Sequence, residues 1–435
     1  MFIIIKIGIG KGMKYMKNND NRVIFHIDVN SAYLSWTAVH MLQQGASLDI
    51  RQIPSIVGGD PVTRHGIVLA KSMPAKKFKI KTGETIYSAL QKCPDLYISP
   101  PKYDLYMKCS NAMVELLKEY TPTIQRFSVD ECFLDFTNME NLYPNFVELA
   151  HEIKDRIKKE LGFTVSIGIS NNKLLAKVAS DIKKPDAVVS LFPLEIKKKM
   201  WPLPVEDLFM VGRATLPKLH NLNIFTIGDL ANCDLKLLKE KLKSHGQMIW
   251  NYANGIEFSE VRKSNHIDIK GIGNSTTIAF DVSLRSEAHK VILSLSETVG
   301  MRLRDSSNCC SLVSIHFRTS EFSSAGRQRK IHYYTDSTRS IAGIACELFD
   351  ELWKGEPLRQ IGVRVSELCT NEFCQTTFFE DKRNVKNSAL DSTLDGIRLK
   401  FGSKSVIRCT FLHSGIKPLM GGVQEDDYQL MSSIL

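Results

Sequence analysis

The chain has 435 residues, 43% of them hydrophobic, and it carries 57 Lys and Arg against 47 Asp and Glu, a formal net charge of +10. This length predicts about three domains with real cores, and the basic excess favours a polyanionic partner such as nucleic acid. The 10 cysteines are scattered without zinc-type spacing, which argues against a disulfide frame or a zinc knuckle and indicates reduced, cytoplasmic thiols.

Residues 1–20 are expected to be an N-terminal extension, either a disordered tail or the product of a misassigned start, because Met13 and Met16 are alternative starts. The apolar stretch Met1–Ile9 is too short to cross a bilayer, and no other segment has transmembrane character. The sequence therefore predicts no membrane partner.

The first predicted strand, residues 22–29, carries an acid near its end. Its apolar residues recur at every second position, a period that places Asp28 on the less apolar face. Tyr33 follows five residues after Asp28, at a junction between strand and helix. Taken alone, Tyr33 is as readily a core residue as a functional one.

A second acidic segment, with two adjacent acids, lies in a predicted hairpin over residues 124–136. Strict alternation would send Asp130 and Glu131 to opposite faces, so only a bend or bulge lets both reach one site. Three acids brought together would hold two divalent cations, which prefer oxygen ligands and clamp both oxygens of an in-line phosphoryl displacement. The two segments predict metal-dependent phosphoryl transfer; the alternative is a set of solvated acids at strand ends.

A helix is predicted over residues 171–182, with Ser170 or Asn171 as its N-cap. Opposite its apolar stripe lies a basic face, because residues four positions apart are neighbours on a helix. Such a face is either solvated or supplies countercharge to a polyanion. Its lysines are Lys173, Lys177 and, just beyond the helix, Lys184.

Several short helices are predicted between residues 205 and 255. Within them, Val211–Leu219 is similar to a helix-hairpin-helix turn, in which glycine lets backbone N–H groups approach a DNA phosphate. Gly212 and Arg213 are the expected phosphate contacts. Residues 256–267 are polar and charged, which is typical of a linker.

Residues 268–374 are expected to form an α/β domain. Ile315 and Phe317 alternate with polar residues, which gives that strand one core face and one solvent face. A charged sheet lying against a duplex backbone fits this pattern, and solvated surface charge is the alternative. The predicted strands are 311–318 and 327–334, the predicted helices are 287–304 and 341–353, and the expected DNA contacts are Arg318, Arg327 and Arg329.

The run Gln375-Thr376-Thr377-Phe378-Phe379 begins the expected C-terminal segment, residues 375–435. Gln375 followed by the aromatic pair Phe378 and Phe379 can fill the small polar and hydrophobic pockets of a bacterial sliding clamp. A strand end packed into the preceding domain is the alternative. Gln429–Ser433 is a poorer clamp candidate because it lacks aromatic residues.

The order, spacing and identity of these motifs, over about residues 23–420, resemble the Y-family translesion DNA polymerases. The matching segments are His26–Tyr33, Val57–Gly59, Gly66–Ala70, Ala75–Gly83, Tyr106 with Ser110, Ser128–Asp135, Val165–Asp181 and Lys183–Pro185. The resemblance implies an α+β multidomain fold, a right-hand polymerase. Its parts would be a palm (21–35 and 100–190), fingers (36–99), a helical thumb (191–255), a linker (256–267), an α/β little finger (268–374), and a clamp-binding segment with a tail (375–435).

The resemblance also implies a role for each site residue. Tyr33 would be the steric gate that leaves no room for a 2′-hydroxyl, so the enzyme would prefer deoxynucleotides. Two Mg²⁺ ions, replaceable by Mn²⁺, would be held by Asp28, Asp130, Glu131 and the Val29 carbonyl. The triphosphate would be approached by Lys76, Lys102, Tyr106 and Lys184, and DNA by Lys173 and Lys177.

The implied activity is low-fidelity, template-dependent synthesis across damaged bases, without proofreading. The implied partners are primer-template DNA, deoxynucleoside triphosphates, the bacterial sliding clamp and a recombinase or other damage-response proteins, in the cytoplasm at the nucleoid. Met73 and Lys76 depart from the Tyr and Arg of many members, and lysine lacks the planar fork of arginine. This departure favours the UmuC-like over the DinB-like branch.

Two other functions fit parts of the sequence. Gly58-Gly59-Asp60 faintly resembles a nucleotidyl cyclase signature on a palm-like fold, but the expected Glu-Phe does not follow it. A catalytically idle DNA-binding subunit is the other alternative, and the intact acids argue against it.

Overall fold

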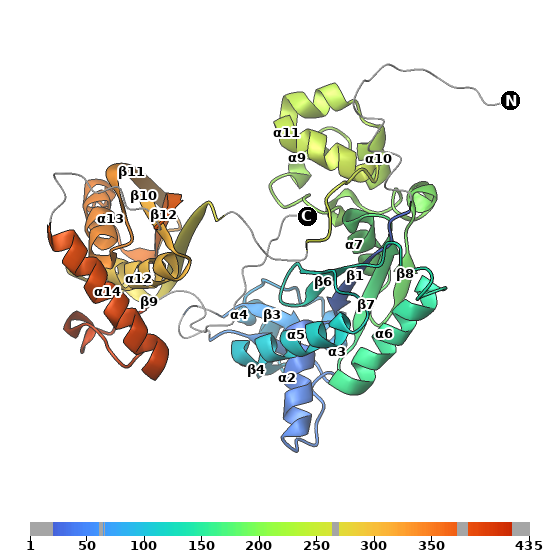
Figure 1. Cartoon of the computed structure of the whole chain (residues 1–435), viewed down its shortest axis with the longest axis horizontal. Helices are drawn as coiled ribbons and strands as arrows, with labels where there is room; N and C mark the ends of the chain where they lie inside the picture. Colours follow the sequence, from blue (N-terminus) through green and yellow to red (C-terminus); the bar gives the residue numbers. More distant parts are fainter. Residues whose placement is uncertain (1–20, 61–63, 65, 263–268, 372–381, 420–435) are drawn as a thin grey trace.

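The computed structural model describes residues 21–60, 64, 66–262, 269–371 and 382–419 (Figure 1). Within these ranges the strands form three sheets, of five, four and three strands. Each sheet has its own buried apolar cluster, and a further cluster lies among helices without a sheet. Four structural regions result, which correspond in chain order to the expected palm, fingers, thumb and little finger.

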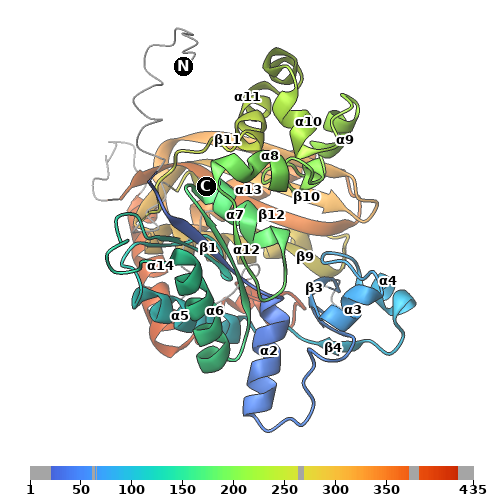
Figure 2. The same cartoon turned by 90° about the vertical axis from the view of Figure 1, so that its right-hand side faces the viewer.

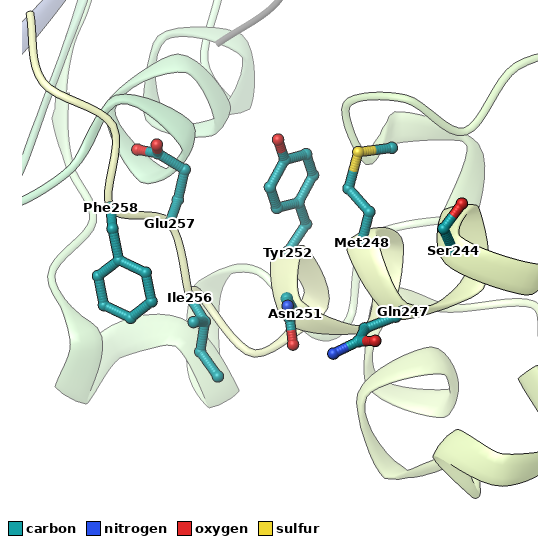
Figure 3. A pocket seen from close by; sticks show the side chains of 8 residues that line it. All are labelled: Ser244, Gln247, Met248, Asn251, Tyr252, Ile256, Glu257 and Phe258. Carbon is teal, nitrogen blue, oxygen red and sulfur yellow. The ribbon is translucent and has the colours of Figure 1, made fainter. Parts of the chain in front are cut away.

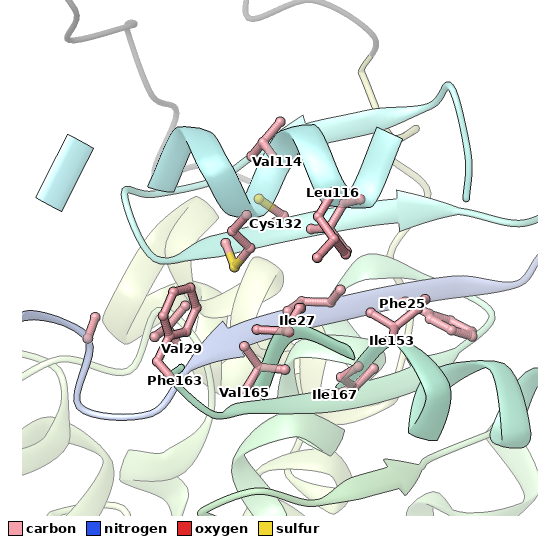
Figure 4. Packing of buried hydrophobic residues seen from close by; sticks show 14 of the residues in the cluster. Phe25, Ile27, Val29, Val114, Leu116, Cys132, Ile153, Phe163, Val165 and Ile167 are labelled. Carbon is pink, nitrogen blue, oxygen red and sulfur yellow. The ribbon is translucent and has the colours of Figure 1, made fainter. Parts of the chain in front are cut away.

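The five-stranded sheet has β1 at its centre, in the order β5-β6-β1-β7-β8. Helices α5 and α6 pack on one face and α7 on the other, so both faces are covered and Ile24 and His26 are as buried as Phe25 and Ile27 (Figures 1 and 4). The expected polar face of β1 is therefore an interior face. The elements are β1 (Ile24–Val29), β5 (Ile124–Arg126), β6 (Glu131–Asp135), β7 (Val165–Ser170), β8 (Val188–Ser190), α5 (Tyr103–Lys118), α6 (Phe146–Leu161) and α7 (Lys173–Ile182).

Helix α7 lies unusually close to the sheet because β7 contains Gly168. A Cβ at this position would stand 1.9 Å from the Ala176 carbonyl oxygen, inside any possible contact. The helix begins at Lys173, two residues later than predicted, because Asn172 is the N-cap and its side chain accepts the Leu175 N–H at 2.8 Å. Close packing brings the basic face of α7 toward the acidic end of β1 and β6.

The fingers form a small separate sheet beside helix α2 (Ala32–Gln43) (Figure 2). Its strand order is β3-β2-β4, with β2 parallel to β4 and antiparallel to β3. Its core contains Ile56, Val68 and Ile86. The elements are α2 (Ala32–Gln43), β2 (Ser55–Gly58), β3 (Val68–Lys71), α3 (Met73–Lys77), α4 (Ile86–Lys92) and β4 (Tyr97–Ser99).

The thumb consists of short helices, as predicted, apart from α11, which is 19 residues long. The backbone of α11 departs from helical geometry at Lys243. A pocket of about 340 Å³ lies between α11 and the segment that follows it, lined by Tyr252 and Phe258 among others (Figure 3). The helices are α8 (Ile196–Lys199), α9 (Leu216–His220), α10 (Ile227–Asn232) and α11 (Leu235–Ala253).

The first part of the expected linker, residues 256–262, packs against the palm. Val261 is buried beside Phe133 of β6, and Glu257 is buried as well. The Arg262 backbone N–H donates to the Gln125 side chain at 3.1 Å. The polar composition predicted a solvated connector, whereas this half of it is an interface.

The little finger is an antiparallel sheet in the order β11-β10-β12-β9, with α12 and α13 on one face (Figure 1). The predicted strands and helices are confirmed and are longer than expected, and Ile315 and Phe317 face the core as predicted. Arg64 of the fingers donates to Asp281 of β9 at 2.7 Å. The elements are β9 (Gly271–Val282), α12 (Arg285–Asp305), β10 (Asn308–Thr319), β11 (Ser324–Thr335), α13 (Thr338–Leu352) and β12 (Leu358–Thr370).

Residues 382–419 belong to the little finger and are not a tail. Helix α14 (Lys382–Phe401) lies along α12 and α13 (Figure 1), and Arg398 donates to the almost completely buried Glu297 at 3.1 Å. Arg408 reaches the same carboxylate oxygen at 2.9 Å. Composition alone did not predict this docking, because the contacts are ionic and lie far apart in the sequence.

Candidate active site

The two acidic segments meet at one end of the palm sheet. Asp28 is the register partner of Glu131 across the β1–β6 ladder, and the Val29 N–H donates to the Asp130 carbonyl at 3.1 Å. Asp130 lies in the bend just before β6, and Glu131 is the first residue of that strand. The predicted bend therefore exists and brings the three acids into one neighbourhood.

The surroundings of the acids disfavour isolated negative charge. Burial raises the pKa of Asp28 to about 6, with Lys184 opposing the shift and Glu131 adding to it. Burial also raises the pKa of Asp130, although that carboxylate accepts a hydrogen bond from the Ser128 hydroxyl at 2.5 Å. Partly desolvated carboxylates of this kind require cations close to them.

Two lysines from the α7 region supply those cations. The Lys184 ammonium lies 2.9 Å from a carboxylate oxygen of Asp28 and 2.7 Å from one of Asp181. Burial opposes the lysine charge, but these two carboxylates outweigh it and raise the pKa of Lys184. Lys177 forms an ion pair with Glu131 in the same way.

The acids have the right chemistry for a hard divalent cation, since all three present carboxylate oxygens in a partly buried site. In the described part of the chain, however, no three His, Cys, Asp or Glu side chains are arranged as a complete metal site. Ammonium groups hold Asp28 and Glu131 instead. The carboxylate oxygens are suitable ligands for a pair of metal ions. To bind these ions, Asp28 and Glu131 must first release Lys184 and Lys177.

Lys173 does not lie where the expected DNA contact requires. Its side chain is completely buried, and its ammonium donates to Gln125 at 3.3 Å and stands 5.7 Å from the centre of the Phe133 ring. Burial lowers the pKa of Lys173 to about 8. The first turn of α7 is covered by the docked residues 256–262, so this lysine is part of an interior interface and the prediction of a DNA contact is wrong.

Tyr33 stacks on Tyr106 in an aromatic layer between the palm and the fingers. Their ring centroids are 4.4 Å apart at an angle of 7°. Tyr106 is completely buried, and its hydroxyl is hydrogen-bonded to Thr37 at 3.0 Å. Its expected contact with a triphosphate disagrees with this burial; Tyr106 instead supports the Tyr33 ring from behind.

The remaining triphosphate candidates are accessible. Lys76 is exposed on α3 of the fingers, and Lys102 is exposed at the N-cap of α5. Both side chains are at the surface of the protein and outside its hydrophobic cores. Their roles stay predictions.

The expected DNA contacts of the little finger divide by sheet face. Arg329 forms ion pairs with Glu347 and Glu351 of α13, and Arg327 also pairs with Glu351. These two arginines therefore lie on the helix-covered side of the sheet, where acids of α13 neutralise them, and this favours the open face for the duplex. Alternation puts Arg318, Lys330 and Arg364 on the open face.

Other predicted contacts are either accessible or outside the described residues. Gly212 and Arg213 are exposed in the loop before α9, with open space around the Gly212 Cα. Gln375, Phe378 and Phe379 lie outside the described residues, as does the extension 1–20. The clamp prediction is thus untested.

Among the described residues, no helix is both long and apolar enough to span a membrane.

Two aromatic residues near the acids escaped the sequence analysis. Phe127 and Phe209 place their ring centroids 5.0 and 5.9 Å from the Lys177 ammonium. Phe127 directly precedes the acidic motif and could have been noticed for that reason. Phe209 lies in the thumb and carries no local signal, since only the tertiary fold brings it to the palm.

Comparison with known proteins supports the assignment of this site to a palm. The impB/mucB/samB family matches residues 27–181, and the C-terminal domain of that family matches residues 269–378. The chain is similar in fold to a solved Y-family DNA polymerase chimera, Dbh-Dpo4-Dbh, with a TM-score of 0.67 at 22% identity, covering 80% of this chain and 100% of the chimera.

Three curated relatives extend the likeness over nearly the whole chain. A protein of Clostridium acetobutylicum named DNA polymerase IV is 48% identical, covering 90% of this chain and 98% of its own. The DNA polymerase IV of Acetivibrio thermocellus is 40% identical over 89% of this chain and 96% of its own length. DNA polymerase IV 2 of Bacillus subtilis is 34% identical over 90% of this chain and 95% of its own length. These names give no support to a closer link with the UmuC-like branch or to a cyclase. The chain belongs to the Y family of DNA polymerases.

Proposed function

We propose that this protein is a low-fidelity, template-dependent DNA polymerase that extends primers across damaged bases without proofreading. The observation that carries the proposal is the meeting of Asp28, Asp130 and Glu131 at one end of the palm sheet, with Lys177 and Lys184 against them. Carboxylates and exchangeable lysines at one place suit a reaction that brings both metal ions and a triphosphate.

In this proposal Asp28, Asp130, Glu131 and the Val29 carbonyl hold two magnesium ions, for which manganese can substitute. When bound, the metals lower the pKa of the primer 3′-hydroxyl and neutralise the leaving pyrophosphate. The chain itself orients the carboxylates: the β1–β6 register fixes Asp28 opposite Glu131, and the Ser128 hydroxyl holds Asp130.

Lys184 is the proposed triphosphate ligand closest to the acids. Its side chain is one-third exposed, and it shares its charge between Asp28 and Asp181, so an incoming phosphate can take over the ammonium. Lys76 approaches from the fingers and Lys102 from the start of α5, both as point charges. Tyr33 excludes ribonucleotides, and the stacked Tyr106 keeps its ring from yielding to a 2′-hydroxyl.

The proposed contacts with primer-template DNA lie in the thumb and the little finger, outside the group of acids. The backbone N–H groups near Gly212, together with Arg213, bind a phosphate of the thumb side. On the little finger, Arg318, Lys330 and Arg364 of the open sheet face form the proposed contact with the duplex, in place of the arginines on the covered face.

We also propose a bacterial sliding clamp as partner, bound by Gln375, Phe378 and Phe379, because a glutamine and two aromatics suit its pockets. Tethering would raise the local concentration of enzyme at the primer end without changing the chemistry. A recombinase or other damage-response protein is a further proposed partner, and the place of action is the nucleoid in the cytoplasm.

Primer extension with magnesium on undamaged and lesion-bearing templates tests the proposal. Asp130→Asn should reduce nucleotide insertion by roughly 100-fold or more while leaving DNA affinity nearly unchanged, because it removes charge from the reacting centre and not from the DNA-binding surface. Asp135→Asn, at the far end of β6, the strand that follows Asp130, is the matched control and should extend normally. Near-normal extension by Asp130→Asn would refute the site assignment.

A further inference from the structure

The Lys177 ammonium is enclosed by two aromatic rings and one catalytic acid. It stands 5.0 Å from the Phe127 centroid and 5.9 Å from the Phe209 centroid, and it is ion-paired with Glu131. Only 13% of the Lys177 side chain and 16% of the Glu131 side chain are exposed. A cation on a ring face is attracted by the ring quadrupole, and more strongly where it is desolvated. The rings therefore strengthen the hold of Lys177 on Glu131.

The two rings belong to different domains. Phe127 directly precedes the palm segment that carries the acids, whereas Phe209 belongs to the thumb, three residues before Gly212. Phe209 packs edge-on against Phe127 at 6.0 Å and stacks on Tyr252 of α11 at 6.4 Å. Tyr252 in turn lines the pocket of Figure 3. The Phe209 ring thus lies between Phe127 of the palm and Tyr252 of the thumb.

This arrangement places a competitor on a proposed metal ligand. Lys177 is paired with the Glu131 oxygen Oε1, so a metal ion that binds this oxygen must displace the ammonium. Lys177 is tied to the palm through α7 and Phe127, and to the thumb through Phe209. A movement of the thumb residues around Phe209 therefore changes how firmly Lys177 competes with a metal ion for Glu131, without any change in the acids.

We propose that Phe209 is a positioning residue through which the thumb controls access of metal ions to Glu131. With the ring in place, Lys177 stays on the carboxylate and metal binding is weak. When a DNA phosphate engages the exposed loop at Gly212 and Arg213, the ring withdraws and Lys177 is released more easily. The inference rests on the proposed role of Glu131 as a metal ligand.

Binding of Mn²⁺ to the full chain, followed by electron paramagnetic resonance, tests this coupling without turnover. The measurement is made with and without a primer-template whose primer ends in a dideoxynucleotide. Phe209→Leu keeps the apolar bulk but removes the ring face, so Mn²⁺ should bind about 2–5-fold more tightly without DNA, the factor that corresponds to 0.5–1 kcal/mol. The gain in Mn²⁺ affinity that DNA produces should shrink by the same factor.

Matched variants separate positioning from a general effect on the fold. Phe258→Leu, an exposed aromatic of the same pocket, should leave Mn²⁺ binding unchanged. In a Lys177→Met background, Phe209→Leu should have no further effect, because its route to Glu131 is gone. Thermal unfolding checks that each variant is folded, and Phe209→Met replaces Phe209→Leu if the latter is not.

The outcomes distinguish a failure of the positioning role of Phe209 from a failure of Glu131 as a metal ligand. Unchanged Mn²⁺ affinity in Phe209→Leu, or an equal shift in Phe258→Leu, overturns the positioning role. A shift that persists in the Lys177→Met background overturns it as well. If Glu131→Gln itself leaves Mn²⁺ binding unchanged, the metal assignment of the proposed function fails, and the positioning role fails with it.

Discussion

The palm and the little finger both neutralise basic side chains against acids of neighbouring elements, but the pairs differ in what can replace them. In the palm, Lys184 stands on Asp28 at the end of the sheet, one-third exposed. In the little finger, Arg398 stands on Glu297, and the two side chains are 5% and 1% exposed. In the proposed function a metal ion and a phosphate separate the palm pair, whereas the little-finger pair is buried within its domain.

The difference shows that a count of charges says little about where a polyanion binds. A lysine or arginine serves a ligand only where the ligand can reach it and compete for its partner. Burial also decides what is lost when one partner is removed: an exposed pair contributes little, but a lone buried charge costs several kcal/mol. The following predictions test this division between exchangeable and sealed pairs.

Removing the gate should produce the largest effect. Tyr33→Ala should raise the ribonucleotide-to-deoxynucleotide ratio of insertion efficiencies by roughly 100-fold, because only the 2′-hydroxyl feels the lost clash. Single-nucleotide insertion kinetics with matched nucleotide pairs measure the ratio. Tyr33→Phe, which keeps the ring on Tyr106, is the control. An unchanged ratio in Tyr33→Ala would make Tyr33 a core residue only.

The exchangeable palm pair should matter next. Lys184→Met should lower the efficiency of deoxynucleotide insertion by about 10–100-fold, since a charge-assisted hydrogen bond to the triphosphate is worth about 1.5–3 kcal/mol. Presteady-state kinetics should show a weaker apparent nucleotide affinity. The exposed neighbour Lys183, changed to Met, should behave as wild type. Equal losses in both variants would mean that only general charge matters here.

The sealed pair should affect stability and not chemistry. Arg398→Met leaves the Glu297 carboxylate with one partner fewer in a buried site, and should lower the free energy of unfolding by about 3 kcal/mol. Denaturant unfolding of the full chain measures this, with the exposed Lys400→Met as control. A loss no larger than that of the control would show that Arg408 alone satisfies Glu297.

The raised pKa of Asp28, about 6, predicts that protons compete with metal in the palm. A metal ligand must be deprotonated, so below pH 6 the half-saturating magnesium concentration for insertion should rise roughly tenfold per pH unit. Above pH 7 it should level off. DNA affinity, measured by fluorescence anisotropy, should stay constant over the same range. A half-saturating concentration that is flat from pH 5.5 to 7.5 would contradict the shift.

The smallest effect should separate the two faces of the little-finger sheet. Lys330→Met should reduce the slope of log affinity for DNA against log salt by about 1, the loss of one phosphate contact. Arg329→Met, on the covered face, should leave the slope unchanged and cost less than about 1 kcal/mol of stability. If Arg329→Met lowered the slope and Lys330→Met did not, the duplex would bind the sheet face that carries α13.

Local sequence was sufficient for several elements and for the acids. Period-2 patterns located β1 and two of the four little-finger strands, β10 and β11, and the need for both Asp130 and Glu131 to reach one site required the bend that the structure contains. The lysine face of α7 followed from helical spacing. These features depend on neighbours within a few residues, and such neighbours are visible in the sequence.

Only the tertiary structure decided which groups surround each of those residues. Lys173 is covered by residues 256–262, Tyr106 is enclosed behind Tyr33, and Arg329 faces α13, although each carries the same local pattern as its exposed neighbours. The docking of 382–419 was equally hidden. The physical reason is that periodicity fixes the face on which a side chain lies, whereas the segment that covers this face comes from elsewhere in the chain and is chosen by long-range packing and ion pairing.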